Sequence, residues 1–242
     1  VIDEIAGRPW GPTVPDTTTF EDAVNVLKKY GLWGKVPDSV REYLRRGLVD
    51  PSLETPKPSD FEGLRVRDVV LADNGTMCEA AKKRAEELGL KSLILSTRLE
   101  GESREAGAVL ACIAKEIEAK GRLAKPPCAL ILGGETTVTI TGQMGKGGPS
   151  QEFVLGASLK IAGSRRIVVA SIDTDGTDGP TEIAGGIADG YTLRRAEKKN
   201  LDVFQDLMRH NSSKVLVKLQ DEILTGPTET NVMDLDVLVI TS

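Results

Sequence analysis

The chain has 242 residues, of which 40% are hydrophobic and 28% are charged, the composition of an ordinary globular protein. Its 31 basic and 36 acidic residues give a formal net charge of −5, which argues against a broadly basic nucleic-acid-binding surface. The single histidine excludes metal sites that need two, and three cysteines without a CxxC pair argue against a disulfide framework. No apolar run approaches the roughly 18 residues needed to span a bilayer, and no signal peptide is visible, so we expect a cytoplasmic location.

Residues 1–62 do not have the pattern of a complete domain. A helix is predicted from about residue 20, capped by one of three threonines at 17–19 and stopped at Gly31, and a second short helix is predicted over 39–46. Pro56 and Pro58 predict a stiff, extended linker, so we place a domain boundary near residue 62. The first residue is not methionine, and we expect either a removed leader or a longer parent chain.

From residue 63 onward, strand patterns alternate with helix patterns. We predict strands at residues 66–72, 92–96, 128–132, 167–172 and 237–241. A further run at 136–141 is rich in β-forming residues. We predict helices at residues 76–88, 103–120, 150–161 and over most of 191–218. This alternation predicts an α/β domain over residues 63–242, built on a mainly parallel sheet with flanking helices.

Two glycine-rich segments stand where such a domain binds ligands, after a strand or at the start of a helix. Gly133-Gly134-Glu135-Thr136-Thr137 directly follows a buried strand, and its two glycines allow a ligand to approach the backbone closely. The segment 145–152 contains Gly147 and Gly148 and opens a helix, whose N-terminal amides suit an anion, and Lys146 adds a positive charge. Each segment is also explained by ordinary turn chemistry, and neither is a Walker A sequence.

Two oxygen-rich segments complete the set. Residues 173–181 contain three carboxylates, Asp173, Asp175 and Asp178, which repel one another unless a cation or hydrogen-bond donors compensate them. Such oxygen ligands suit Mg²⁺, which binds one or two carboxylates together with phosphate. Residues 225–234 carry small hydroxyl and amide side chains before the last strand. The sequence has no nucleophile elbow and no dinucleotide fingerprint, and the inventory fits Mg²⁺-assisted phosphoryl transfer.

His210 and the start of the helix at Ser103 have simpler interpretations. His210 lies near a helix end and is expected to be a surface or capping residue. Ser103 is expected to cap its helix, while Arg104 and Glu102 beside it are weaker ligand candidates.

The four motifs, in this order and spacing, resemble those of the class II glycerate kinases, whose C-terminal half is the MOFRL domain. Residues 11–16, 54–58 and 101–105 resemble the segments that precede them in that family, so the resemblance covers essentially the whole chain. It implies ATP- and Mg²⁺-dependent phosphorylation of D-glycerate, usually to 2-phosphoglycerate, in a cleft beside an N-terminal Rossmann-like domain. Residues 1–62 would be the C-terminal tail and linker of that domain. The chain departs from the family at Pro149, where many members have arginine, and at Trp10, where serine is usual.

Carried onto matching positions, the resemblance implies a set of site residues. The candidate catalytic residues are Asp175, Asp173 and Lys146, and the candidate metal ligands are Asp173 and Asp178. The candidate substrate- or phosphate-binding residues are Gly133, Gly134, Glu135, Thr136, Gly147, Gly148, Arg104, Thr228 and Asn231. Asp175 is the expected acceptor of the hydroxyl proton.

Two other functions remain open at this point. One is hydroxypyruvate reduction, which needs a nicotinamide site, and the other is a non-catalytic module that binds a phosphorylated metabolite. For the kinase we expect ATP and Mg²⁺ as cofactors, D-glycerate as substrate, and no nucleic-acid or membrane partner, with a homodimer left open.

Overall fold

The computed structural model describes residues 3–242 except 6–7, 12 and 143, and the chain divides into two compact units. Unit 1 is Val1–Leu71 and unit 2 is Ala72–Ser242. Within the described residues, no helix is long and apolar enough to cross a membrane. That residues 1–62 are the tail of a larger Rossmann-like domain stays a prediction.

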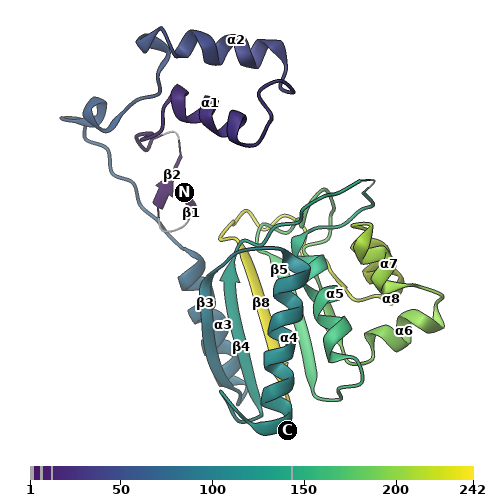
Figure 1. The fold of residues 1–242 in the computed structure, drawn as a ribbon. Coiled ribbons are helices and arrows are strands. Elements are labelled where there is room, and N and C mark those ends of the chain that lie inside the picture. The colour runs from purple at the N-terminus through teal and green to yellow at the C-terminus, as the bar shows by residue number, and fades with distance from the viewer. Residues whose placement is uncertain (1–2, 6–7, 12, 143) are drawn as a thin grey trace. The chain divides into compact units, whose positions relative to one another are not determined.

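Unit 1 contains a small hairpin and two helices (Figure 1). Strand β1 (Asp3–Ile5) pairs antiparallel with β2 (Arg8–Trp10), and α1 (Phe20–Lys29) and α2 (Asp38–Gly47) follow. Two short 3₁₀ helices, η1 (Pro51–Leu53) and η2 (Pro58–Phe61), end the unit's regular structure. Of the three candidate caps, Thr19 begins α1, in a reciprocal capping box with Asp22. The buried Phe20 ring packs edge-on against Tyr43 of α2, at 5.5 Å between centroids.

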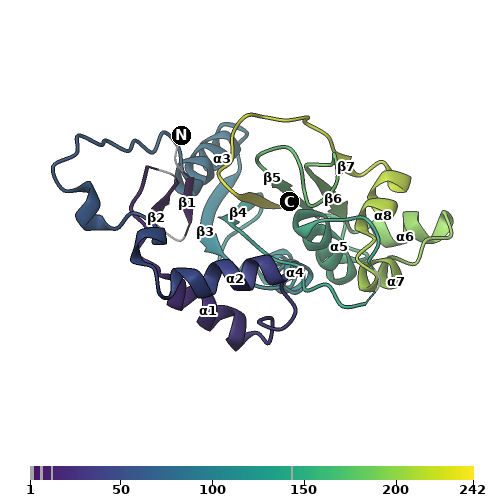
Figure 2. The same ribbon diagram turned by 90° about the horizontal axis from the view of Figure 1, so that it is seen from above.

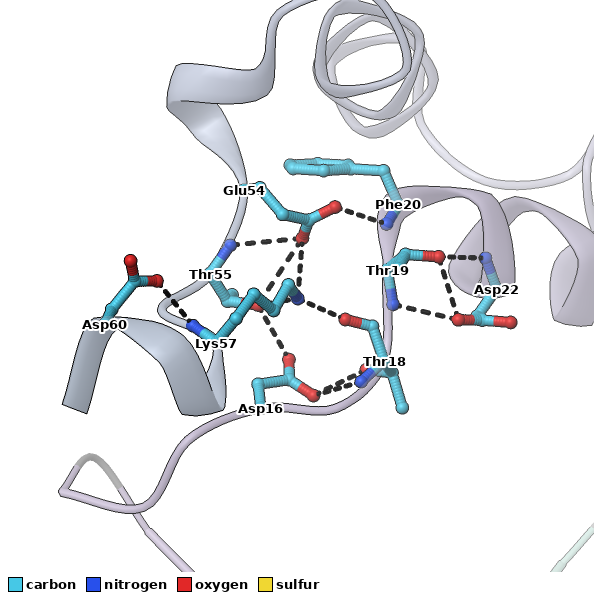
Figure 3. Close-up of polar contacts among 9 residues, drawn as sticks. All are labelled: Asp16, Thr18, Thr19, Phe20, Asp22, Glu54, Thr55, Lys57 and Asp60. Carbon is cyan, nitrogen blue, oxygen red and sulfur yellow. Dashed lines mark hydrogen bonds and ion pairs between the residues drawn. The ribbon is translucent and has the colours of Figure 1, made fainter. Parts of the chain in front are cut away.

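Lys57 links the segment before α1 to the segment that follows η1 in unit 1 (Figure 3). Its ammonium donates to Glu54 Oε1 at 3.2 Å, to Thr55 Oγ1 at 2.9 Å and to the Thr18 carbonyl. Glu54 Oε2 in turn accepts from the Phe20 amide at 3.2 Å, and Thr55 Oγ1 donates to Asp16 Oδ2 at 3.0 Å. The segments 16–20 and 54–57, which are distant in sequence, therefore form one polar network.

Unit 2 is a six-stranded mixed sheet in the order β3-β4-β8-β5-β6-β7. The strands are β3 (Lys91–Leu99), β4 (Cys128–Gly134), β5 (Ile167–Asp173), β6 (Gly185–Asp189), β7 (Glu222–Ile223) and β8 (Asp234–Ile240). The helices are α3 (Asn74–Glu87), α4 (Ser103–Lys120), α5 (Pro149–Ile161), α6 (Thr192–Lys198), α7 (Val203–Met208) and α8 (Ser212–Leu219).

Three layers form unit 2 (Figure 2). Helix α3 packs on one face of β3 and β4 through a small cluster that includes Cys78 and Ile131. Helices α4 and α5 cover the other face around the main core, and α6, α7 and α8 lie beyond α5. Helices α4 and α5 approach closely because Gly107 faces the backbone of Phe153 and Gly156 faces the backbone of Arg104.

The α/β fold is confirmed, but the expected mainly parallel sheet is wrong. Among the described residues of this sheet, only β3 and β4 pair in parallel, and the other four strand pairings are antiparallel. The alternation of helices and strands did predict that β3, β4 and β5 run the same way. However, the C-terminal strand β8 inserts between β4 and β5, and β6 returns beside β5 after a loop. A local pattern indicates strand direction but not which strand becomes the neighbour.

Most of the predicted elements are present, but several elements depart from the predictions. The predicted strand at 66–72 is an irregular segment with exposed side chains such as Val69 and Leu71, because alternation alone provides no hydrogen-bonding partner. The run at 136–141 is a loop with one isolated bridge, from Thr137 to Glu102. The glycine-rich β6 and the two-residue β7 were not predicted, since neither has a clear apolar pattern.

Candidate active site

The register of the sheet brings three of the motifs to one edge of unit 2. Strands β4 and β5 both end there, at Gly134 and Asp173, and the intervening strand β8 begins there. Asp234, the first residue of β8, pairs with Gly134 on one side and with Asp173 on the other. The loops 135–148, 174–184 and 224–233 therefore all leave the sheet beside Asp234.

The segment 133–137 is packed against backbone and side chains from three directions. A Cβ on Gly133 would lie 1.9 Å from Asn74 Oδ1, and one on Gly134 would lie 2.2 Å from the Leu99 amide. The buried Thr136 donates its amide to Asp234 Oδ2 at 3.2 Å and accepts the Ser103 hydroxyl at 2.8 Å. The close approaches to Asn74 and Leu99 explain why glycine occupies positions 133 and 134. The hydrogen bond from Ser103 attaches the segment to the start of α4.

Asn74, the first residue of α3, is a site-edge residue that the sequence analysis missed. It is buried, and its amide donates to the carbonyls of Val232 and Asp234, at 2.8 and 3.2 Å. It thereby fixes the start of α3 to the loop before β8, next to Gly133 in β4. Its only signal in the sequence was its place at the start of a helix, which is commonplace.

The glycine loop, residues 145–148, is held on the turn between α7 and α8. The Gly145 amide donates to the Arg209 carbonyl at 2.9 Å, and the Ser213 amide donates to the Lys146 carbonyl at 3.1 Å. The Lys146 amide donates to Asn211 Oδ1 at 3.3 Å, while its side chain is exposed. The loop is thus fixed by backbone contacts, and its lysine reaches into solvent.

Asp178 caps α5 from a distant loop. The buried Asp178 carboxylate accepts from the amides of Ser150 at 3.0 Å and Gln151 at 2.9 Å, the first free donors of the helix. Because these amides are occupied by Asp178, they are not available to an external anion. Asp178 was predicted as a metal ligand, but both of its carboxylate oxygens accept hydrogen bonds from the helix. Burial raises the pKa of Asp178 to about 6, although these hydrogen bonds oppose the rise.

The loop after β5 is built from side chains that accept hydrogen bonds from its own backbone. Asp173 accepts from the Asp175 amide at 3.1 Å, and Asp175 Oδ1 accepts from the Thr177 amide at 2.7 Å and hydroxyl at 2.8 Å. The Thr228 amide donates to the Asp175 carbonyl at 3.0 Å, so the fourth motif packs directly on the third. Asn231 accepts from the Met233 amide at 3.0 Å and shapes its own turn.

Several carboxyl groups with raised pKa values lie at this edge of the sheet. Burial raises the pKa of Asp234 to about 8, and the charge of the neighbouring Asp236 adds to this rise. Burial also raises the pKa of Asp236, to about 7. Burial also raises the pKa of Asp173, with the charges of Asp175 and Glu135 adding to the effect. No group of three or more histidine, cysteine or carboxylate side chains is arranged to hold a metal within the described residues.

The histidine is placed differently from the sequence expectation. His210 is buried, with a left-handed φ of 51°, and its Nδ1 lies 2.9 Å from Oε1 of Glu152, which is 1% exposed. It is neither a surface residue nor a simple cap, because α5 supplies a buried carboxylate that no local pattern could place. Burial raises the pKa of Glu152, while the hydrogen bond to His210 and the charge of Arg104 oppose the rise. The Arg104 guanidinium contacts Met208 and Glu105.

Two family models match parts of this chain. Residues 128–234 match the MOFRL family, and this region contains the loops of all four motifs. Residues 2–45 match a domain of unknown function, DUF4147.

Relatives of this chain confirm its resemblance to glycerate kinases. It is 46% identical to a Glycerate 2-kinase of Pyrococcus horikoshii over all of this chain and 54% of the relative. It is 40% identical to a D-glycerate 2-kinase of Thermotoga maritima over 97% of this chain and 52% of the relative. A solved structure titled glycerate kinase, from T. maritima, is 39% identical with a TM-score of 0.74, over 94% of this chain and 51% of that one. This chain therefore spans about half the length of the curated relatives it matches.

Proposed function

We propose that the protein is a kinase that transfers the γ-phosphoryl group of ATP to the 2-hydroxyl of D-glycerate, with Mg²⁺. The supporting observation is the convergence of three of the four motifs on one sheet edge, around Asp234, in a chain 46% identical to a protein named Glycerate 2-kinase. Phosphoryl transfer depends on positioning and on neutralising charge, and does not need a protein nucleophile. The fixed backbone loops of this edge provide positioning, and its carboxylates would hold the cation that neutralises the phosphate charge.

The residues present are suited to a magnesium ion. Asp173 is half-buried, and burial, with neighbouring carboxylate charges adding to the effect, raises the pKa of Asp173 and of Asp234; a bound cation would oppose both rises. We assign Asp173 as the metal-holding carboxylate, while Asp178 acts mainly by fixing α5 and the loop beside it. When bound, Mg²⁺ would supply charge neutralisation for the phosphates.

Asp175 is our proposed acceptor of the hydroxyl proton. Its Oδ1 is held by Thr177, so the carboxylate is oriented while Oδ2 keeps its capacity to accept. The glycerate oxygen forms the new bond to the γ-phosphorus as the bond to the nucleotide oxygen breaks, and the proton passes to Asp175.

The remaining proposed contacts surround this centre. Lys146, exposed on the glycine loop, and Arg104 at the start of α4 are the proposed cationic contacts for substrate charge. The proposed backbone and polar contacts are Gly133, Gly134, Glu135, Thr136, Gly147, Gly148, Thr228 and Asn231.

The test is ³¹P NMR of the full-length protein with D-glycerate, ATP and Mg²⁺. A Mg²⁺-dependent 2-phosphoglycerate signal supports the proposal, and a 3-phosphoglycerate signal changes the acceptor carbon. In the same assay Asp175→Asn should lower kcat by at least about 100-fold. The matched control is Asp202→Asn, because Asp202 makes a similar backbone bond at the start of α7. Turnover of Asp175→Asn like that of wild type would reject the role of Asp175.

Hydroxypyruvate reduction is the second candidate, because two Agrobacterium vitis relatives, 36% and 33% identical, are named Putative hydroxypyruvate reductase. NADH oxidation with hydroxypyruvate would support it over the kinase. Tight binding of a phosphorylated metabolite without either turnover would instead support a non-catalytic module.

A further inference from the structure

A pocket of about 220 Å³ opens beside the glycine loop of unit 2. Its walls are largely apolar and are formed by Val138, Ile140, Met144, Pro149 and Pro180. Ile140 and Met144 expose 54% and 51% of their surface, although both are large apolar residues. The volume is below the roughly 300–1,000 Å³ typical of sites for whole drug-sized ligands, so the pocket suits a fragment of a ligand.

Two buried polar groups line this apolar pocket. Glu152 and His210 both contribute to its lining, and their side chains are 1% and 6% exposed. Glu152 Oε1 and His210 Nδ1 satisfy each other, whereas Glu152 Oε2 and His210 Nε2 have no hydrogen-bond partner among the described residues. Buried polar atoms are nearly always satisfied in folded proteins, so an unmatched pair at a pocket indicates a missing ligand or water.

The chemistry of the pair defines what can satisfy it. A carboxylate accepts at both oxygens, so Nδ1 of His210 donates to Glu152 Oε1. In the uncharged imidazole this leaves Nε2 as an acceptor, and Glu152 Oε2 is an acceptor as well. The pocket therefore presents two acceptors within apolar walls. Its complement is a largely apolar group that carries N–H donors.

We propose that this pocket binds the amino-substituted heteroaromatic base of the phosphoryl donor, with the amino group donating to the Glu152–His210 pair. The inference rests on the proposed kinase function. Gly147 and Gly148 border the pocket, as do Gly179 and Pro180, which directly follow Asp178. A base held here directs the rest of the donor along the glycine loop toward Asp173. The pair thus selects an amino base over an oxo base, whose oxygen would face two acceptors.

The test compares the binding of adenosine and inosine to the full-length protein by isothermal titration calorimetry. Adenosine carries an amino group where inosine carries an oxo group, and we expect adenosine to bind about ten-fold more tightly or better. Glu152→Gln keeps an oxygen for His210 and replaces the free acceptor by an N–H donor. It should therefore lower or reverse the preference. Glu197→Gln is the matched control, because Glu197 lines a different pocket beside α6 and should leave the preference unchanged.

A second variant tests the location without touching the buried pair. Ile140→Lys changes an exposed wall residue and should weaken adenosine binding at least about ten-fold. Unchanged adenosine binding in Ile140→Lys, or an unchanged adenosine preference in folded Glu152→Gln, overturns the proposal. Glycerate phosphorylation without adenosine binding at this pocket would remove the pocket assignment and keep the kinase. Adenosine binding with the Glu152-dependent preference, but no phosphorylation, would keep the pocket and remove the kinase.

Discussion

The close crossing of α4 and α5 makes two glycines sensitive to the smallest enlargement, a single methyl group. A Cβ on Gly107 would lie 2.1 Å from the Phe153 carbonyl oxygen, and one on Gly156 would lie 2.2 Å from the Arg104 carbonyl oxygen. Ordinary contacts begin at 3.4 Å, so each Gly→Ala substitution must separate the two helices by about 1.3 or 1.2 Å. Both opposing atoms are backbone atoms, which no side-chain rotation can move away.

The expected cost follows from two opposing effects. Overpacking a well-packed contact costs about 1–3 kcal/mol, and a backbone neighbour places these sites at the upper end. Replacing glycine by alanine within a helix stabilises the folded state by about 1 kcal/mol, because alanine has the higher helix propensity. We therefore expect Gly107→Ala and Gly156→Ala each to lower the free energy of unfolding of unit 2 by about 2 kcal/mol. The double variant should cost less than the sum, since one separation of the helices relieves both contacts.

Urea unfolding followed by far-UV circular dichroism measures this loss. Trp10 and Trp33 both belong to unit 1, so tryptophan fluorescence provides a separate signal from the other unit. The control is Gly75→Ala in α3, where the nearest atom to a new Cβ is Asp73 Oδ1 at an ordinary 3.5 Å. That variant should be neutral or slightly stabilising. The reasoning is refuted if Gly107→Ala and Gly156→Ala are no less stable than Gly75→Ala.

Three other predictions concern the buried carboxylates, the loop before β8 and unit 1. The folded-state pKa values of Asp178, Asp234 and Asp236, about 6, 8 and 7, lie above the ordinary aspartate value of 3.8, so protonation favours the folded state. The free energy of unfolding should fall as pH rises from 5 to 9. Asp236→Asn should make the urea midpoint depend less on pH across that range. Asn74→Ala should cost about 1–3 kcal/mol by urea unfolding, because two buried carbonyls lose their donor; a cost near zero would contradict this role. Lys57→Met should destabilise unit 1 by about 1 kcal/mol in tryptophan-monitored unfolding, whereas Lys35→Met, at an exposed position, should not.

Several features of unit 2 were predictable because their causes are local. The apolar faces of α4 and α5 and the continuous apolar run of β4 are visible as periodicity, and their bounds were predicted to within two residues. The four motifs were also found directly, because glycine, aspartate and threonine cluster after strands. Their order carried the resemblance to glycerate kinases, which the relatives confirm.

The functions of single residues within those motifs were less predictable. Asp178 stands in a run of three aspartates, yet it is buried at the start of α5, 27 residues away from its partner Gln151. Nothing in the run 173–178 distinguishes a capping carboxylate from a metal ligand. His210 was similarly ambiguous, because its partner Glu152 lies 58 residues away on another helix.

The sequence by itself determined the helices, most of the strands and the composition of the candidate site, since these depend on neighbours within a few turns of the chain. The tertiary structure alone decided that β8 lies between β4 and β5, and therefore that Asp234 stands between Gly134 and Asp173. It alone decided the crossing of α4 and α5 at two glycines and the burial of Glu152 against His210. These features depend on contacts between residues distant in sequence, and their free energies arise only when the separate elements pack together.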